Sequence, residues 1–259
     1  MTTTSQRRQR ILQLLMEHGN VQVSELSPSF NVSAVTIRND LSFFEEQGLV
    51  TRTYGGAFLK RPQHAPERAA AVARGVTAPG AARGERIGAR AARLIRPGDN
   101  ILIDAGTAAY RLARHLAAAS GLTVMTNGLD IAAELAATEG IRLLCTGGML
   151  DREARSFVGT QAEQGLDGYH FDKVFLDADG FDLKHGITAH DEATARLKRR
   201  MIEAAGTCIV LLDSAKCGQI GLHRIAPLSR VGAVIADPDL PAEYREALER
   251  LEIDIAVAD

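Results

Sequence analysis

Hydrophobic positions recur with two different periods along the chain. Between residues 1 and 58 they follow helical spacing, as where Ile37, Leu41 and Phe44 stand at i, i+4 and i+7. Between residues 85 and 259, short continuous apolar runs alternate with alanine-rich amphipathic runs. This pattern predicts a small helical unit followed by a larger unit of alternating strands and helices.

The N-terminal unit is predicted to hold three helices and a pair of strands. In chain order, we expect a helix from Ser5 to His18 that stops at Gly19, a short helix from about Ser24 to Phe30, a turn at Asn31 and Val32, a helix over Ala34–Gln47 capped by Ser33, and two strands around a Gly55-Gly56 turn. Pro28 lacks the N–H donor that a helix interior needs, so it falls in the tolerated first turns or makes the second helix irregular. The order is that of a winged helix-turn-helix.

The third of these helices suits a DNA recognition helix. Since its apolar stripe faces inward, its other side is free to enter the major groove, where Arg38 and Asn39 can read base edges through paired hydrogen bonds. The residues expected to contact DNA are Ser33, Ala34, Thr36, Arg38, Asn39 and, in the wing, Arg52. Residues 1–61 hold seven basic and five acidic side chains, a net charge of +2 against −2 for the whole chain. A small three-helix domain for protein contact is the alternative that spacing leaves open.

The larger unit is predicted to be a mostly parallel sheet with helices on both faces. The expected strands are Asn100–Asp104, Leu122–Thr126, Ile141–Cys145, Lys173–Asp177, Cys208–Leu212, Ala233–Ala236 and Asp254–Val257. The expected helices between them are Ala108–Ala119, Leu129–Ala137, Glu192–Ala205 and Ala242–Leu251. Continuous apolar strands that alternate with helices are typical of an α/β fold of Rossmann-like type.

A linker is expected between the two units. Residues 59–84 carry Pro62, Pro66 and Pro79 together with several glycines, and they lack a strong apolar face. We therefore divide the chain into a DNA-binding domain at 1–58, with its helix-turn-helix at 21–40, a linker at 59–84 and a ligand-binding domain at 85–259.

Polar residues and glycines follow five of the predicted strands. The loops are Asp104–Thr107, Thr126–Gly128, Thr146–Gly148, Asp177–Gly180 and Asp213–Lys216. Because parallel strands end at one edge of their sheet, these loops should converge where α/β folds bind ligands. Glycines and helix N-termini favour a phosphate there, Lys216 adds a positive charge, and the carboxylates can hold hydroxyls. The combination predicts a sugar-phosphate pocket.

Each of these residues also has a simpler explanation when taken singly. Gly106 or Gly148 could serve a tight turn, Asp104 could cap a helix, and Lys216 could be an ordinary surface lysine. The ligand hypothesis depends on the convergence of the five loops.

Composition excludes several classes of protein. Apolar residues make up 46% of the chain, yet no apolar run approaches the about 20 residues that cross a membrane, and we expect no signal peptide. Cys145, Cys208 and Cys217 show no CxxC spacing, so we expect reduced thiols, a cytoplasmic location and no disulfide framework or zinc site. No metal and no other cofactor is expected.

Residues 7–58 resemble the DeoR family of sugar-metabolism regulators. The similar stretches are VQVSEL, FNVSAVTIRNDL and GLVTRTYGGA, and the family's helix-turn-helix corresponds to Val21–Asp40. TIRNDL together with YGGA resembles most the branch that regulates the use of amino sugars such as N-acetylgalactosamine. Pro28 departs from the family, which usually has polar helix formers there.

The larger unit resembles the DeoR effector domain, which shares its fold with ribose-5-phosphate isomerase and CoA transferases. On the family's motifs, the resemblance implies effector contacts by Asp104, Gly106, Thr107, Thr126, Asn127, Asp179, Glu192, Lys198 and Lys216, to which the loop analysis adds Gly147 and Gly148. Ala108 stands where the family has a second threonine, and Ala189-His190 replaces a polar pair. The later runs DGFDLKHGIT and GLHRI again resemble the amino-sugar branch.

Two functions follow from these observations. The first is a repressor that binds double-stranded operator DNA as a homodimer or homotetramer and releases it when a phosphorylated sugar binds. The second is a sugar-phosphate isomerase with a DNA-binding appendage, for which Asp179, Asp182 or Glu192 could supply a general base. The helix-turn-helix favours the repressor, because an isomerase gains nothing from it; we therefore expect no catalytic residues.

Overall fold

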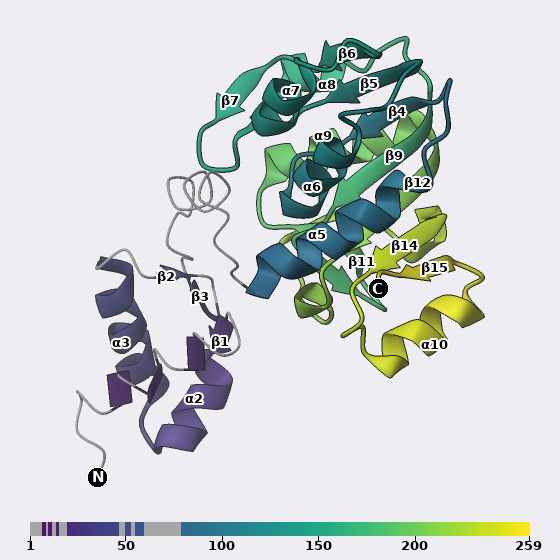
Figure 1. Ribbon diagram of the computed structural model, residues 1–259. Helices are drawn as coiled ribbons and strands as arrows, with labels where there is room; N and C mark the ends of the chain where they lie inside the picture. Colours follow the sequence, from purple (N-terminus) through teal and green to yellow (C-terminus); the bar gives the residue numbers. More distant parts are fainter. Residues whose placement is uncertain are drawn as a thin grey trace. The chain divides into compact units, whose positions relative to one another are not determined.

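The structure, a computed structural model, describes residues 7–8, 10–11, 14–15, 20–46, 50–52, 55–59 and 79–259. The chain forms two compact units, Met1–Ala69 and Ala70–Asp259 (Figure 1). No helix in the described ranges is long and apolar enough to cross a membrane.

The N-terminal unit has the predicted helix-turn-helix and wing. Its described elements are a helix that includes residues 7, 8, 10, 11, 14 and 15, strand β1 (Asn20–Gln22), helix α2 (Val23–Phe30), helix α3 (Ala34–Glu46), strand β2 (Val50–Arg52) and strand β3 (Gly56–Leu59). The three strands form an antiparallel sheet in the order β1-β3-β2. Strand β1 was not predicted. The expected cap at Ser5 and the stop at His18 and Gly19 lie outside the described residues.

The core of this unit is the apolar stripe that the sequence predicts. Ile37, Leu41 and Phe44 of α3 are buried together with Ile11 and Leu15. Helix α2 contains Pro28 and ends at Phe30, and the following Asn31, with a left-handed φ of 52°, turns the chain toward α3.

The larger unit is built on seven parallel strands in the order β15-β14-β12-β9-β4-β5-β6 (Figure 1). Their bounds are β4 Asn100–Ile103, β5 Leu122–Thr126, β6 Ile141–Cys145, β9 Phe171–Asp177, β12 Ala205–Leu212, β14 Ala233–Ala236 and β15 Asp254–Val257. The seven predicted strands are confirmed. Phe171 and Ala205 begin their strands earlier than expected, and Asp104 lies just beyond the end of β4.

Helices cover both faces of this sheet, as predicted. One face is covered by α5 (Pro79–Ala92), α6 (Thr107–His115) and α7 (Leu129–Leu135), and the other by α8 (Thr160–Gln164), α9 (Glu192–Glu203) and α10 (Ala242–Arg250). Successive strand residues divide between the two layers: Leu102 packs with the α9 side, whereas Ile101 and Ile103 pack with the α6 side.

Several predicted boundaries are wrong. Helix α5 was not predicted, and it begins at Pro79, inside the segment interpreted as linker. Its buried Ile87 and Ala91 pack on the sheet, but its many arginines obscure this apolar stripe in the sequence. The predicted helix Glu192–Ala205 ends at Glu203, and Ala205 already belongs to β12. The predicted helix Ala108–Ala119 ends at His115.

Short antiparallel pairs flank the main sheet, and none was predicted. They comprise the hairpin of β7 (Met149–Asp151) and β8 (Ser156–Val158) and a three-stranded sheet of β10 (Gly180–Asp182), β11 (Gly186–Ala189) and β13 (His223–Ala226). The run of three to four residues in each is too short to carry a periodic signal.

Candidate functional site

The exposed side of α3 carries a stripe of three residues. Val35, Arg38 and Asn39 stand at i, i+3 and i+4, and all three are exposed. Neither Arg38 nor Asn39 engages its side chain in a hydrogen bond or ion pair within the part of the chain that the structure describes. Both are therefore free to meet a ligand, and the predicted outward orientation of these two residues is confirmed.

Two of the residues predicted to contact DNA, Ser33 and Thr36, hydrogen-bond to each other in the first turn of α3. The Oγ of Ser33 accepts a hydrogen bond from the backbone N–H of Thr36 at 3.2 Å, and the two hydroxyls lie 3.0 Å apart. Ala34 is half-buried against the core of the unit. Arg52 ends β2, but its side chain lies outside the described residues. Ser33 thus caps the helix as expected, and Ala34 contributes to its packing.

Two of the seven basic side chains in residues 1–61 form ion pairs within the unit. Arg7 Nε lies 2.6 Å from Oδ2 of the buried Asp40, and Arg8 Nε lies 2.7 Å from its Oδ1. The Arg8 guanidinium also stacks 3.8 Å above the ring of Phe43. These contacts fix the first helix against α3, so the two positive charges serve the fold of the unit.

In the larger unit, five neighbouring parallel strands bring the predicted loops to one edge. Strands β12, β9, β4, β5 and β6 are adjacent in the sheet, and all their pairings are parallel. At about 4.8 Å per strand, however, the loops after β12 and β6 are separated by roughly 19 Å. One small ligand can contact the central loops together. It cannot contact both the loop after β12 and the loop after β6.

A buried ion pair lies beneath the central loops. Lys198 Nζ is 2.9 Å from Asp104 Oδ2 and donates to the carbonyl oxygen of Asp177 at 2.7 Å. Burial raises the pKa of Asp104, and the charge of Lys198 opposes that rise. Burial acts to lower the pKa of Lys198, but the surrounding carboxylates outweigh it and hold the pKa above its usual value. Lys198 is therefore charged at neutral pH.

Asp177 lies between two residues of the predicted phosphate site. Its Oδ1 accepts a hydrogen bond from Lys216 Nζ at 2.8 Å. Its Oδ2 lies where a side chain at position 106 would be, since a Cβ added to Gly106 would come within 2.2 Å of it. Gly106 immediately precedes α6. The carboxylate of Asp177 thus lies between Lys216 and the N-terminus of that helix.

Asp179 is an ionised carboxylate at the same edge. Its Oδ2 accepts a hydrogen bond from the backbone N–H of His190 at 3.1 Å. Burial acts to raise the pKa of Asp179, but the charges of Lys198 and Lys216 and the His190 N–H lower it below its ordinary value. The group is negatively charged at neutral pH and is a weak base.

Thr126 and Asn127 are buried and hold the loops in place. Thr126 Oγ1 accepts from the N–H of Gly128 at 3.0 Å, and Asn127 Oδ1 accepts from the N–H of Ala105 at 2.9 Å. The second bond ties the loop after β5 to the loop after β4.

Three other predicted residues make no hydrogen bond or ion pair with Asp177, Asp179 or Lys216 among the described residues. Gly147 and Gly148 have φ values of 66° and 108° and lead into the β7–β8 hairpin, where a side chain on Gly148 would come within 2.8 Å of the Val158 carbonyl oxygen. Glu192 is exposed in the first turn of α9. The turn explanation therefore suffices for Gly148.

The loop that carries Lys216 is fixed by a buried aspartate that the sequence analysis missed. Asp237 accepts hydrogen bonds from the N–H of Ser214 at 2.7 Å and from its hydroxyl at 2.9 Å. It directly follows β14, as Asp104 follows β4 and Asp213 follows β12. A sixth polar residue after a predicted strand was the signal that could have identified it.

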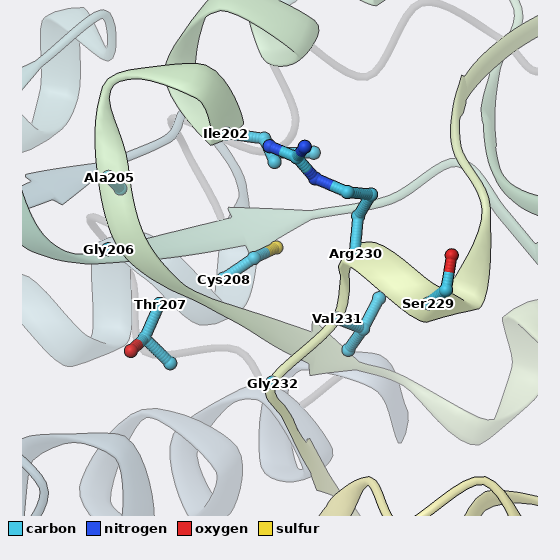
Figure 2. A pocket seen from close by; sticks show the side chains of 9 residues that line it. All are labelled: Ile202, Ala205, Gly206, Thr207, Cys208, Ser229, Arg230, Val231 and Gly232. Carbon is cyan, nitrogen blue, oxygen red and sulfur yellow. The ribbon is translucent and has the colours of Figure 1, made fainter.

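A cavity of about 310 Å³ opens at the other end of β12 (Figure 2). It is lined by Ala205–Cys208 at the start of that strand, by Ser229–Gly232 and by Ile202. It is thus separate from the loop cluster, which follows the end of the strand. Among the described residues, no three histidine, cysteine or acidic side chains gather closely enough to hold a metal ion.

Comparison with known proteins decides the family. Residues 7–63 match the DeoR-like helix-turn-helix domain, and residues 81–238 match the DeoR C terminal sensor domain. The chain belongs to the DeoR family. It is a DNA-binding transcriptional regulator of the DeoR type, and the predicted resemblance is confirmed.

Other DeoR-type regulators are similar to this one over almost their whole length. A protein of Escherichia coli O157:H7 named as a transcriptional repressor of the aga operon is 40% identical over 258 residues, covering 98% of this chain and 94% of its own. The transcriptional repressor AccR of Agrobacterium fabrum is 33% identical, with 99% and 98% covered, and the repressor GlcR of Bacillus subtilis is 31% identical, with 96% and 94% covered.

Among solved structures, ribose 5-phosphate isomerase A from Methanocaldococcus jannaschii is similar with a TM-score of 0.39 and 16% identity, over 52% of this chain and 53% of that one. The delta subunit of eIF2B from Chaetomium thermophilum gives 0.39 and 17%, over 56% and 54%. Similarity this low carries no conclusion about function.

Proposed function

We propose that this DeoR-family regulator is a repressor of a sugar or amino-sugar catabolic operon and that a phosphorylated sugar relieves the repression. The DNA-binding unit holds the operator through α3, and the sensor unit binds the effector at the carboxyl edge of its parallel sheet. The similarity to a protein named for the aga operon supports an amino sugar as the source of the effector.

The observation that carries the proposal is the pairing of Lys216 with Asp177 beside Gly106. A lysine ammonium and a helix N-terminus lie on either side of one carboxylate, and both are groups that bind phosphate. The anion of an effector would replace the Asp177 carboxylate between them, with Thr107 adding a hydroxyl from the first residue of α6.

The remaining predicted residues divide into two groups in this proposal. The ionised, partly buried carboxylate of Asp179 accepts hydrogen bonds from sugar hydroxyls. The buried residues position the loops from below; they are Asp104, Thr126, Asn127 and Lys198. Gly147, Gly148 and Glu192 lie outside the contact set that we propose.

The buried carboxyl of Asp104 adds a feature typical of a binding site. Its Oδ1 has no hydrogen-bond partner, although the residue is fully buried. Buried polar atoms without a partner are rare in native proteins and are often tied to function. A rearrangement of the loops on effector binding would provide Oδ1 with a partner.

The charge state of the carboxylates supports a regulator over an isomerase. A general base for neutral pH works best with a pKa near 7. The pKa values of Asp179 and Asp182 are instead lowered, that of Asp182 because the His185 N–H and imidazole bonds outweigh its burial. Asp104, whose pKa is raised, is buried and paired with Lys198. We propose that the site binds its sugar phosphate without converting it.

A titration tests this proposal. Operator duplex bound to the full-length protein is titrated at fixed salt with phosphate esters of N-acetylgalactosamine and galactosamine, while anisotropy follows release. Unphosphorylated sugars and glucose 6-phosphate are the controls. Release by a phosphorylated amino sugar alone supports the proposal. Steady conversion of the ester into an isomer would support the enzyme instead.

A further inference from the structure

We propose that Val35 reads the operator by packing against the methyl group of a thymine in the major groove. Val35 belongs to the DNA-binding unit, so this contact does not depend on the effector. Val35 is absent from the DNA contacts expected from the sequence, because a valine in a helix is usually part of a core.

Val35 is an apolar side chain that lies outside the hydrophobic core of its unit. It is 61% exposed, and among the described residues before Ala70 it is the one large hydrophobic side chain that is exposed. The neighbours Ala34 and Ile37 turn toward the core, so the orientation of α3 keeps Val35 outside. Folding of this unit therefore leaves most of Val35 exposed to solvent.

Helix stability does not favour valine at this position either. Val35 is the second residue of α3, and a β-branched side chain loses rotamer freedom in a helix. Alanine, arginine or glutamate would each be better helix formers there. Neither core packing nor helix stability therefore accounts for a valine at position 35. A contact with a binding partner would account for it.

The position of Val35 indicates what that contact is. It shares the exposed stripe with Arg38 and Asn39, one turn further along α3, and the N-terminal half of a recognition helix approaches base edges most closely. In the major groove, base edges present donors and acceptors, and the C5 methyl of thymine is the apolar exception. An isopropyl group placed on a polar edge would leave that edge without a hydrogen bond, whereas on a thymine methyl it buries apolar surface.

The test combines one protein substitution with one atomic change in DNA. Operator duplexes are first obtained by in vitro selection with the full-length protein. Each thymine is then replaced by deoxyuridine, which removes only the methyl group, and affinity is measured by anisotropy at fixed salt. For the wild type we expect one position in each half-site to weaken binding about fourfold, which corresponds to ~0.8 kcal/mol for one buried methyl group.

The variant Val35→Ala should bind the selected operator more weakly by a similar factor and should no longer distinguish thymine from deoxyuridine at that position. Val35→Thr, which keeps one methyl group, serves as the matched control and should retain part of the discrimination. Unchanged melting temperatures of both variants verify folding. The proposal is overturned if Val35→Ala discriminates as the wild type does, or if no thymine replacement weakens wild-type binding.

Discussion

Arg83 and Asp213 form an ion pair between the start of α5 and the loop that carries Lys216. Arg83 Nε lies 2.8 Å from Asp213 Oδ1, and the same oxygen accepts the backbone N–H of Ala215 at 3.0 Å. Helix α5 is the first described helix after the DNA-binding unit along the sequence. We therefore expect this ion pair to pass a change at Lys216 on to α5.

This relationship predicts a variant that binds both ligands but couples them poorly. Arg83→Ala leaves α3, Lys216 and Thr107 in place, so operator and effector affinities measured separately should change less than twofold. The factor by which effector weakens operator binding, commonly about 5–150 in such systems, should fall at least about fivefold. Calorimetry gives the effector affinity, and anisotropy with and without effector gives the coupling.

A charge exchange provides the control for Arg83→Ala. The double variant Arg83→Asp with Asp213→Arg should recover part of the coupling, because it restores an ion pair between the same two positions. If Arg83→Ala couples as well as the wild type while its effector binding is normal, the signal leaves the site by another route.

Removing the buried Lys198 should lower the free energy of unfolding more than removing an exposed charged side chain does. Lys198→Met leaves the Asp104 carboxylate buried without its cation, a change that typically costs about 3–5 kcal/mol in the free energy of unfolding. Arg196→Met on the exposed side of the same helix is the matched control and should cost less than about 1 kcal/mol. Urea denaturation of the two variants compares them directly. Equal losses would show that the buried pair contributes no more than a surface pair.

The sequence predicted the parts of this fold that rest on continuous apolar runs. All seven strands of the main sheet were found because strands buried on both faces are almost uniformly apolar, as in the run that contains Val174 and Leu176. Helices α6, α7, α9 and α10 were found from their alanine-rich amphipathic spacing, with errors at their ends. Helix α5 was missed because only Ile87 and Ala91 mark its buried face, and α8 was missed because it is only five residues long.

The sequence predicted which loops form the site, but it did not predict which side chains contact each other there. Strand ends identify which loops meet, but the partner of each side chain depends on rotamers that no pattern encodes. Asp177 was therefore left out, although its carboxylate lies between Lys216 and Gly106. The burial of Lys198 had a signal, since it shares the apolar stripe of α9 with Ala195 and Ile202. The family resemblance, rather than this stripe, led to its selection.

Arg38 should contribute to specific recognition more than to general DNA affinity. Its exposed guanidinium can pair with the base edges of guanine, so Arg38→Ala should weaken operator binding by about 1–3 kcal/mol and random-sequence binding far less. Competition between operator and random duplexes at constant salt measures the ratio. Equal losses on both duplexes would indicate that Arg38 contacts only phosphate.

The protein is expected to assemble at least as a homodimer, with a homotetramer favoured by the family resemblance. Operators commonly mirror a twofold axis of the protein, because one recognition helix reads too few base pairs for specificity. Light scattering at micromolar concentration, with and without operator, gives the mass. A monomer in both conditions would contradict this expectation.

The most direct measurement is operator release by Lys216→Ala and Thr107→Ala in the presence of a phosphorylated amino sugar. Both variants should bind operator as the wild type does, because neither position belongs to the DNA-binding unit. Both should fail to release it at effector concentrations that release the wild type, since each has lost a phosphate contact. The readout is anisotropy at fixed salt, because salt alone changes DNA affinity strongly. Release by both variants at wild-type effector concentrations would contradict the assignment of the phosphate to Lys216 and the N-terminus of α6.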